Sequence, residues 1–176
     1  DALRWSATTG SIDDEGNFTA GCERDQFNDA IIVRAGIYEV PVDVSVIDGV
    51  LSSIEIEPDQ VTIQADAQRQ LRANLYDGCF NLIEGETTWS LAQGGSITPA
   101  GILSAGTQAR TYVGAVIAEV EGFQDQADLV ITPAEAETLT INPDPLQIEA
   151  GDEIQLEVIA RDQFGNTFIA DAQWTV

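Results

Sequence analysis

Apolar and polar side chains alternate along most of the chain with the two-residue period of a β-strand. Ile54 and Ile56 alternate with Glu55 and Glu57, the pattern of a strand that buries one face. Further strands are predicted at Leu71–Leu75, Thr87–Leu91, Ile102–Ser104, Tyr112–Glu119, Ala127–Ile131 and Ile154–Ala160. Turn signals rich in glycine, proline and aspartate separate these runs at the spacing of a β-sandwich. The pattern therefore predicts an all-β chain.

The sequence also repeats itself with a period of about 85 residues. The block Gly10–Gly21 returns as Gly95–Gly106 with six of twelve positions identical, and Ile54–Pro58 returns as Leu139–Pro143. This register predicts three parts. Residues 1–48 form the C-terminal half of one module, residues 51–133 a complete module, and residues 136–176 the N-terminal half of a further module.

The register places one tryptophan in each module, at Trp5, Trp89 and Trp174. Seven or so short strands in about 85 residues, with a tryptophan on the third strand, are typical of an immunoglobulin-like Greek-key sandwich. We therefore predict tandem immunoglobulin-like Greek-key β-sandwiches, with the three tryptophans as structural core residues. A core role is favoured over a sugar-binding platform, because a tryptophan at this position of a sandwich points inward and fills the centre of the core.

Composition narrows the function. Thirty acidic residues face seven basic residues, all arginine, and the net charge is −23. Such an acidic chain repels nucleic acid and anionic membrane surfaces, and no apolar run is long enough for membrane insertion. Without histidine or lysine, the usual general base of serine hydrolases and the amine of Schiff-base enzymes are both missing. We therefore expect a protein that is not an enzyme.

These features resemble a known family. The pattern Trp-Ser, then Gly-Ser-Ile-x-x-x-Gly-x-Phe/Leu-Thr/Ser-Ala-Gly and an apolar strand, resembles bacterial Ig-like (Big) repeats. The segment Arg161–Asn166 is similar to the Asp-x-x-Gly-Asn turn of invasin- and intimin-type modules, and surface-layer proteins carry similar repeats.

The resemblance implies a secreted structural or adhesive array at the cell surface, such as a stalk, a fibre or a surface-layer component. Its partners would be neighbouring modules of the same or adjacent chains, and a cell-surface or carbohydrate ligand stays open. Two alternatives also stay open. One is a self-assembling filament subunit completed by strand exchange, and the other is a carbohydrate-binding or spacer region of a large secreted enzyme.

The two cysteines depart from the repeat. Cys22 corresponds to Thr107 of the next module, and Cys79 corresponds to Phe164. In an immunoglobulin topology, Cys22 falls in a loop at the C-terminal pole of the first module, and Cys79 falls at the N-terminal pole of the second. We therefore predict a disulfide between them, which requires an oxidising compartment. The alternative is two free, partly buried thiols, or disulfides to other chains.

The only candidate metal ligands are carboxylates. Asp77 and Asp162 occupy the same turn in successive modules and could contribute to a calcium site. The alternative is that each aspartate caps the backbone of its own turn. No Asp-x-Asp-x-Asp-Gly loop is present. Calcium is therefore the one cofactor that the sequence leaves open.

Overall fold

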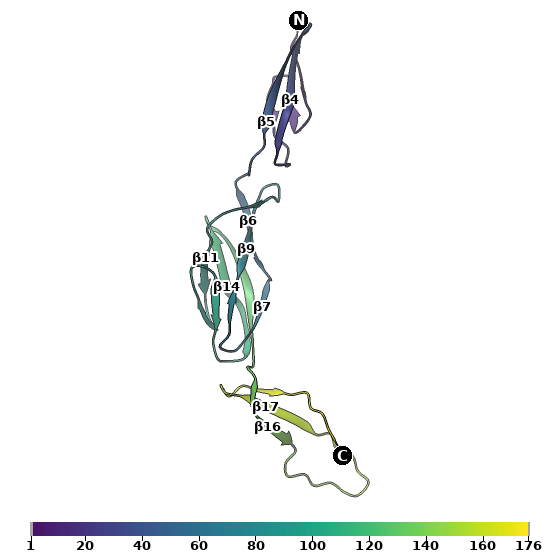
Figure 1. Cartoon of the computed structure of the whole chain (residues 1–176), viewed down its shortest axis with the longest axis vertical. Helices are drawn as coiled ribbons and strands as arrows, with labels where there is room; N and C mark the ends of the chain where they lie inside the picture. Colours follow the sequence, from purple (N-terminus) through teal and green to yellow (C-terminus); the bar gives the residue numbers. More distant parts are fainter. Residues whose placement is uncertain (1, 176) are drawn as a thin grey trace. The chain divides into compact units, whose positions relative to one another are not determined.

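The computed structural model describes residues 2–175, and within that range the chain is built from strands, turns and loops without a helix (Figure 1). The strands are β1 (Arg4–Ala7), β2 (Ser11–Ile12), β3 (Phe18–Thr19), β4 (Gln26–Ala35), β5 (Tyr38–Ser45), β6 (Leu51–Glu57), β7 (Gln60–Gln64), β8 (Gln68–Gln70), β9 (Arg72–Asp77), β10 (Leu82–Ile83), β11 (Thr88–Leu91), β12 (Gly95–Ile97), β13 (Ile102–Ala105), β14 (Arg110–Val120), β15 (Phe123–Thr132), β16 (Ala136–Asn142), β17 (Glu157–Asp162) and β18 (Thr167–Ile169). The all-β prediction is confirmed. The described residues contain no helix that could span a membrane.

The chain divides into two compact units. One consists of Asp1–Ser53 and Leu75–Glu84, and the other of Ile54–Asn74 and Gly85–Val176. The loop that follows β9 therefore groups with the N-terminal residues, although the repeat assigns it to the second module. The module boundaries 1–48, 51–133 and 136–176 stay a prediction.

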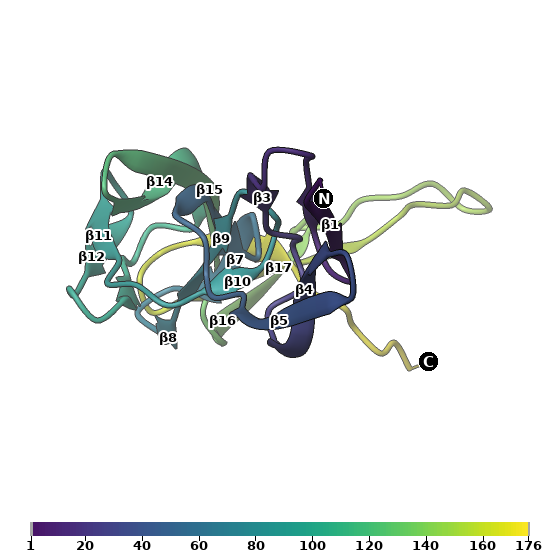
Figure 2. The ribbon, with the colours of Figure 1, turned by 90° about the horizontal axis from the view of Figure 1, so that it is seen from above.

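The first unit contains the antiparallel sheet β1–β4–β5 and the hairpin β2–β3. Figure 2 shows β4 and β5 side by side. Ala30 and Ile31 of β4 are the buried apolar side chains of the β1–β4–β5 sheet. The β4–β5 ladder shifts register between Phe27 and Ile31, where the N–H of Asp29 donates to the carboxylate of Asp43 at 2.8 Å.

The second unit contains the sandwich. One sheet has the order β11–β14–β15–β7, in which β7 runs parallel to β15 and the other pairs are antiparallel. The facing strands are β6 beside β9, and β8 beside β13 and β12. This is the strand order of an immunoglobulin-like Greek-key sandwich, so the β-sandwich prediction is confirmed. Its largest fully buried side chains are Leu103, Leu129, Val61 and Val116.

Pro58 explains why one run of sequence serves both sheets. β6 ends at Glu57 and joins the sheet of β9, whereas β7 begins at Gln60 and pairs with β15. Proline has no N–H to donate to a ladder, so it interrupts strand pairing where the chain crosses between sheets.

The same bulge occurs in β14 as in β4. The β14–β15 ladder shifts register between Tyr112 and Val116, and the N–H of Gly114 donates to Asp128 at 2.8 Å. Asp29 and Gly114, which are 85 positions apart, both adopt positive φ, at 51° and 58°. The periodic sequence therefore produces the same local irregularity at both places.

The last part of the chain forms the sheet β16–β17–β18. The strand predicted at Ile154–Ala160 begins only at Glu157, because the ladder with β16 ends at the pair Asn142 and Glu157. Ile154 lies outside that ladder and is exposed.

The tryptophans do not share one environment. Trp5 on β1 and Trp89 on β11 are half-buried, and each packs on a turn glycine. A Cβ on Gly16 would lie 2.9 Å from the Trp5 ring, and a Cβ on Gly101 would lie 2.9 Å from Nε1 of Trp89. Trp174 follows the last strand and is 53% exposed. The core role predicted for Trp5, Trp89 and Trp174 stays a prediction.

Candidate functional site: two aspartate-capped loops

The same type of hairpin turn occurs four times within residues 2–175. In each, the N–H of the first residue donates to the carbonyl of the fifth, and the N–H of the fourth donates to the carbonyl of the first. The four turns are Asp13–Asn17, Asp77–Asn81, Thr98–Ile102 and Asp162–Asn166. The fourth residue has positive φ in every case, as a three-residue hairpin loop with a left-handed position requires. That residue is glycine in three turns and Phe80 in the Asp77 turn.

Two of these turns bury their aspartate and reach other segments. Asp77 is 3% exposed, and its Oδ1 accepts from the N–H groups of Cys79 and Asn81, both at 2.9 Å. Its Oδ2 accepts from the N–H of Gly49 at 3.0 Å and from Nδ2 of Asn81 at 3.1 Å. Nδ2 of Asn81 also donates to the carbonyl of Cys22 at 3.1 Å. We call this arrangement the Asp77 clamp.

The Asp162 clamp repeats the arrangement. Asp162 is 2% exposed, and its Oδ1 accepts from the N–H groups of Phe164 at 3.0 Å and Asn166 at 2.8 Å. Its Oδ2 accepts from the N–H of Ala134 at 2.9 Å and from Nδ2 of Asn166 at 2.7 Å. Gly49 and Ala134 each lie 28 residues before the aspartate that they contact.

Asn166 extends the second clamp beyond its own loop. Its Nδ2 donates to the carbonyl of Thr107 at 2.8 Å, and its Oδ1 accepts from the N–H of Ala109 at 2.9 Å. Both partners lie in the loop between β13 and β14. Each clamp therefore joins three segments of the chain: its own hairpin, the residue 28 positions before the aspartate (Gly49 or Ala134), and the loop that contains Cys22 or Thr107.

The clamps hold their carboxylates ionised. Burial opposes ionisation of Asp77, but hydrogen bonds from Asn81, Gly49 and Cys79 outweigh it and lower the pKa to about 2. For Asp162, burial again opposes ionisation, and hydrogen bonds from Asn166, Ala134 and Phe164 lower its pKa. A buried carboxylate that accepts several N–H groups acts as a structural anion.

The Asp13 turn has the same local hydrogen bonds but no contact from its carboxylate to another segment of the chain. Its carboxylate is exposed and accepts from Glu15 and Asn17 of its own loop only. The side chain and the N–H of Asn17 together lower its pKa. Of these three aspartates, only Asp77 and Asp162 therefore connect their turns to other segments of the chain.

The clamps also define how a calcium ion could bind. Each oxygen of Asp77 and Asp162 already accepts two N–H groups, so a metal ion would have to displace these donors. Among residues 2–175, no group of three or more His, Cys, Asp or Glu side chains could hold a metal ion. The calcium site at Asp77 and Asp162 stays a prediction.

A disulfide adjoins the Asp77 clamp. Cys22 and Cys79 are bonded with their Cα atoms 5.4 Å apart, which is the pairing predicted from the sequence. Both cysteines also belong to the clamp through their main chains, since the N–H of Cys79 and the carbonyl of Cys22 are two of its contacts. The Asp162 clamp has Thr107 and Phe164 at these positions and no such bond.

Arg24 adds a further contact to the first clamp. Its guanidinium pairs with Asp48 and donates to the carbonyl of Leu82 at 3.0 Å. The aspartates and cysteines were predicted from the sequence, and Asn166 was noted there as part of a turn motif, but Asn81 and the N–H groups of Gly49 and Ala134 were not predicted. The recurrence of asparagine four residues after each aspartate is the signal that could have identified Asn81.

Comparisons with known proteins assign no role to the chain. No protein-family model matches the chain, and no curated protein matches it. Among solved structures, surface layer protein SbsC domains 4–9 are 13% identical with a TM-score of 0.45, over 95% of this chain and 29% of that one. Domains 1–6 of the same protein are 13% identical with a TM-score of 0.45, over 96% and 24%.

A crystal structure of SbsC domains 4 and 5 is 12% identical with a TM-score of 0.43, over 74% of this chain and 70% of that one. The chain spans less than a third of the length of the first two structures. With TM-scores below 0.5, this likeness by itself assigns no role to the chain.

Proposed function

We propose that the chain is a non-catalytic, extracellular structural or adhesive array of immunoglobulin-like modules, of the kind that builds a stalk, a fibre or a surface layer. The observation that carries this proposal is the repeated clamp. Its buried, ionised aspartates connect one predicted module to the next through Gly49 and Cys22, and again through Ala134 and Thr107. These polar groups therefore hold separate segments of the chain together.

The apolar positions support assembly from like modules. Ile54 and Ile56 are 6% and 4% exposed in the central sandwich, whereas Leu139 and Ile141, 85 residues later, are 62% and 48% exposed. Side chains of this kind gain from burial, at about 25 cal/mol per Å² of apolar surface. We infer that a neighbouring module covers them, as β14 and β15 complete the central sandwich.

Two arrangements meet this need. In the first, the neighbouring module belongs to the same polypeptide, as in a continuous array. In the second, a further copy of the chain supplies the covering strands, as in a filament assembled by strand exchange. Leu146 and Ile148 are exposed, whereas Val61 and Ile63, their counterparts on β7, are buried. These exposed side chains are apolar surface that a second copy of the chain could cover, so the second arrangement is tested below.

An extracellular setting is supported by the disulfide and by the charge. Disulfides persist in oxidising compartments, and the bond between Cys22 and Cys79 is accessible at the surface of the first unit. A net charge of −23 favours solubility outside the cell and disfavours binding to nucleic acid. A spacer region of a large secreted enzyme would need the same properties.

The proposal is tested in the cells that produce the protein. Intact cells are treated with a membrane-impermeant protease and a labelled antibody against the chain, and the cysteines are alkylated before and after reduction. We expect surface labelling and alkylation of Cys22 and Cys79 only after reduction. A chain that is found inside the cell with both thiols free contradicts the proposal.

Sedimentation of the purified chain separates the two arrangements. Open-ended association that grows with concentration supports strand exchange. A monomer at all concentrations supports the continuous array. Leu139→Asp and Ile141→Asp are matched variants that remove the apolar surface and are expected to abolish any such association.

A further inference from the structure

The two clamps share their hydrogen bonds but not their reinforcement. In addition to the shared contacts, the Asp77 clamp has the disulfide between Cys22 and Cys79 and the ion pair between Arg24 and Asp48. At the four corresponding positions, 85 residues later, the chain has Thr107, Phe164, Ala109 and Pro133. None of these side chains forms a disulfide or carries a charge. Both reinforcing bonds therefore belong to the Asp77 clamp.

The disulfide joins two residues that are themselves part of the Asp77 clamp. The carbonyl of Cys22 accepts from Asn81, and the N–H of Cys79 donates to Asp77. With the Cα atoms of the two cysteines 5.4 Å apart, the loop of Cys22 cannot move away from the turn while the bond is intact. A hydrogen bond that breaks between these two segments therefore re-forms readily, because its groups stay close together.

Arg24 ties a third segment to the same hairpin. Its guanidinium pairs with Asp48, the neighbour of Gly49, and donates to the carbonyl of Leu82 at 3.0 Å. Both charged side chains are exposed, so the pair contributes little free energy by itself. It does keep the segment of Gly49 beside the turn whose aspartate accepts the Gly49 N–H.

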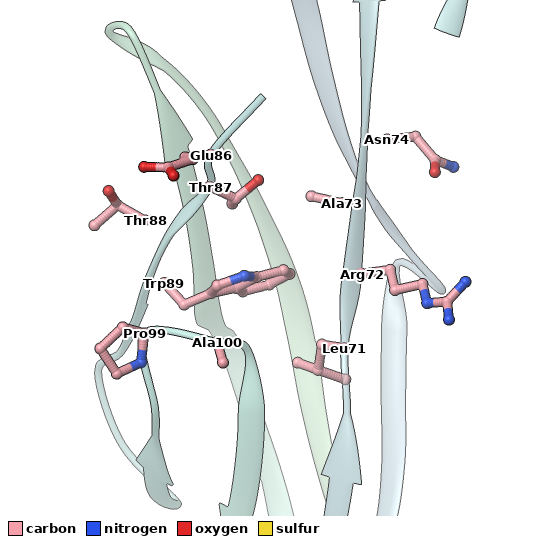
Figure 3. A pocket seen from close by; sticks show the side chains of 10 residues that line it. All are labelled: Leu71, Arg72, Ala73, Asn74, Glu86, Thr87, Thr88, Trp89, Pro99 and Ala100. Carbon is pink, nitrogen blue, oxygen red and sulfur yellow. The ribbon is translucent and has the colours of Figure 1, made fainter. Parts of the chain in front are cut away.

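The hairpin of the Asp77 turn gives the clamp little support of its own. β10 pairs with β9 at only two residues, Leu82 and Ile83. In the second unit, β9 and the segment that enters β11 border an open hollow of about 680 Å³, and Figure 3 shows the ring of Trp89 reaching across it toward Leu71. No ladder joins β9 to β11 within residues 2–175. The disulfide therefore supplies a restraint that the short ladder does not.

The Asp162 clamp has one more hydrogen bond in place of the covalent bond. Oδ1 of Asn166 accepts from the N–H of Ala109 at 2.9 Å, and its hairpin pairs β17 with β18 at three residues. Each hydrogen bond of the clamp contributes little net free energy, because water replaces the partner when the bond opens. Segments held only by such bonds open locally while the rest of a domain stays folded.

We propose that the Asp162 clamp opens and closes within the folded chain, whereas the disulfide between Cys22 and Cys79 keeps the otherwise equivalent Asp77 clamp closed. In the open form, the N–H of Ala134 leaves Asp162 and bonds to water, while the strands stay paired. The chain thus has one fixed connection and one that yields. Opening of the clamps does not depend on where the chain works, so failure of the extracellular role proposed above would leave this difference intact.

Native-state hydrogen exchange of the full chain, followed by NMR at low urea concentrations, tests this difference. The amides of Gly49 and Ala134 are a matched pair 85 residues apart, and each donates to the aspartate of its clamp. Exchange through local opening barely depends on urea, whereas exchange through unfolding accelerates with urea because unfolding exposes much surface. The amides of Ile31 in β4 and Leu129 in β15, two buried residues of central strands, report unfolding.

In the oxidised chain, we expect Ala134 to exchange through local opening, with a protection factor at least about tenfold below that of Leu129. Gly49 should instead follow Ile31 in its dependence on urea. A dithiol reductant then supplies the two electrons and two protons that convert the disulfide into two thiols, and is itself oxidised to a disulfide. After this reduction, Gly49 should also exchange through local opening, while exchange of Ala134 stays unchanged.

A second disulfide should close the Asp162 clamp. Thr107→Cys together with Phe164→Cys places two cysteines at the positions that correspond to Cys22 and Cys79. Once peptide mapping shows that this bond has formed, the protection factor of Ala134 should rise to that of Leu129. The reduced form of the same variant is the matched control, because at this clamp it differs only in the bond.

Two results in the parent chain overturn the proposal, and neither depends on whether the cysteine variant folds. The first is an Ala134 amide that exchanges in the oxidised chain only through unfolding, with the protection and urea dependence of Leu129. It would show that the Asp162 clamp does not open by itself. The second is a Gly49 amide that opens locally as fast before reduction as after it, which would show that the disulfide does not keep the Asp77 clamp closed.

Discussion

The side-chain amide of Asn81 donates a hydrogen bond to the main-chain carbonyl of Cys22, 59 residues earlier in the chain. Asn166 donates in the same way to Thr107, again across 59 residues. In both cases the same amide group also binds the buried aspartate of its own turn. A single asparagine therefore couples a local turn to a distant loop, and it does so twice at the period of the sequence.

Loss of the Asn166 side chain should weaken the Asp162 clamp. Asn166→Ala removes donors to Asp162 and Thr107 and the acceptor for Ala109, so buried polar groups lose their partners. We expect the melting temperature to fall by roughly 4 °C or more. Thermal unfolding followed by circular dichroism measures the change. Gln163→Ala in the same turn is the control, and an equal effect of both variants would contradict the role of Asn166.

The disulfide should stabilise the first unit through its unfolded state. Cys22 and Cys79 are 57 residues apart in sequence, and closing a loop of that size contributes about 2–4 kcal/mol. The double variant Cys22→Ser, Cys79→Ser should therefore unfold at a lower denaturant concentration than the oxidised parent. Reduction of the parent should give a similar shift, and reductant should not affect the variant. Coincident urea curves for the parent and the variant would rule this contribution out.

Acid should remove the contribution of Asp77. Its folded pKa of about 2 lies below the ordinary value of about 3.9, so its contribution is fully present above pH 4 and is lost as the pH falls through about 2. Asp77→Asn should be less stable than the parent at neutral pH, and this difference should shrink between about pH 4 and pH 2.

Urea midpoints at each pH test this expectation. The comparison with the variant is necessary because acid also discharges the other carboxylates and reduces their mutual repulsion. Asp14→Asn, which alters an exposed carboxylate, is the control. A parent-to-variant difference that stays constant from pH 5 to pH 2 would show that the carboxylate of Asp77 contributes nothing through its charge.

Phe80 occupies a backbone conformation that suits glycine. Its φ is 61°, and its side chain is 84% exposed, so it gains little from packing. The corresponding residue of the Asp162 turn is Gly165, with φ 88°. Phe80→Gly should raise the free energy of unfolding by about 0.5–1 kcal/mol, because relief of strain exceeds the added entropy of the unfolded chain. Gly165→Ala, the reciprocal change, should lower it, and chemical denaturation measures both.

Calcium should leave the stability unchanged. The oxygens of Asp77 and Asp162 are already saturated with N–H donors, so a bound ion would have to break the clamps. Melting temperatures in excess calcium and in excess chelator should agree. A higher melting temperature in calcium, lost in Asp77→Asn or Asp162→Asn, would establish the site that the sequence left open.

The sequence by itself determined the properties that depend on near neighbours and on the period. The alternation of Ile54 and Ile56 with Glu55 and Glu57 predicted a half-buried strand, because successive side chains of a strand point to opposite faces. The period predicted that Cys22 and Cys79 meet, since it assigned them to poles of successive modules.

Only the tertiary structure decided the contacts between distant segments. The N–H of Gly49 that reaches Asp77 and the carbonyl of Cys22 that reaches Asn81 carry no local signal. Trp174 repeats the position of Trp89 in sequence but not in burial. The physical reason is that burial and hydrogen bonding at these sites depend on which strands pack around a residue, whereas strand alternation depends only on the residue's own neighbours.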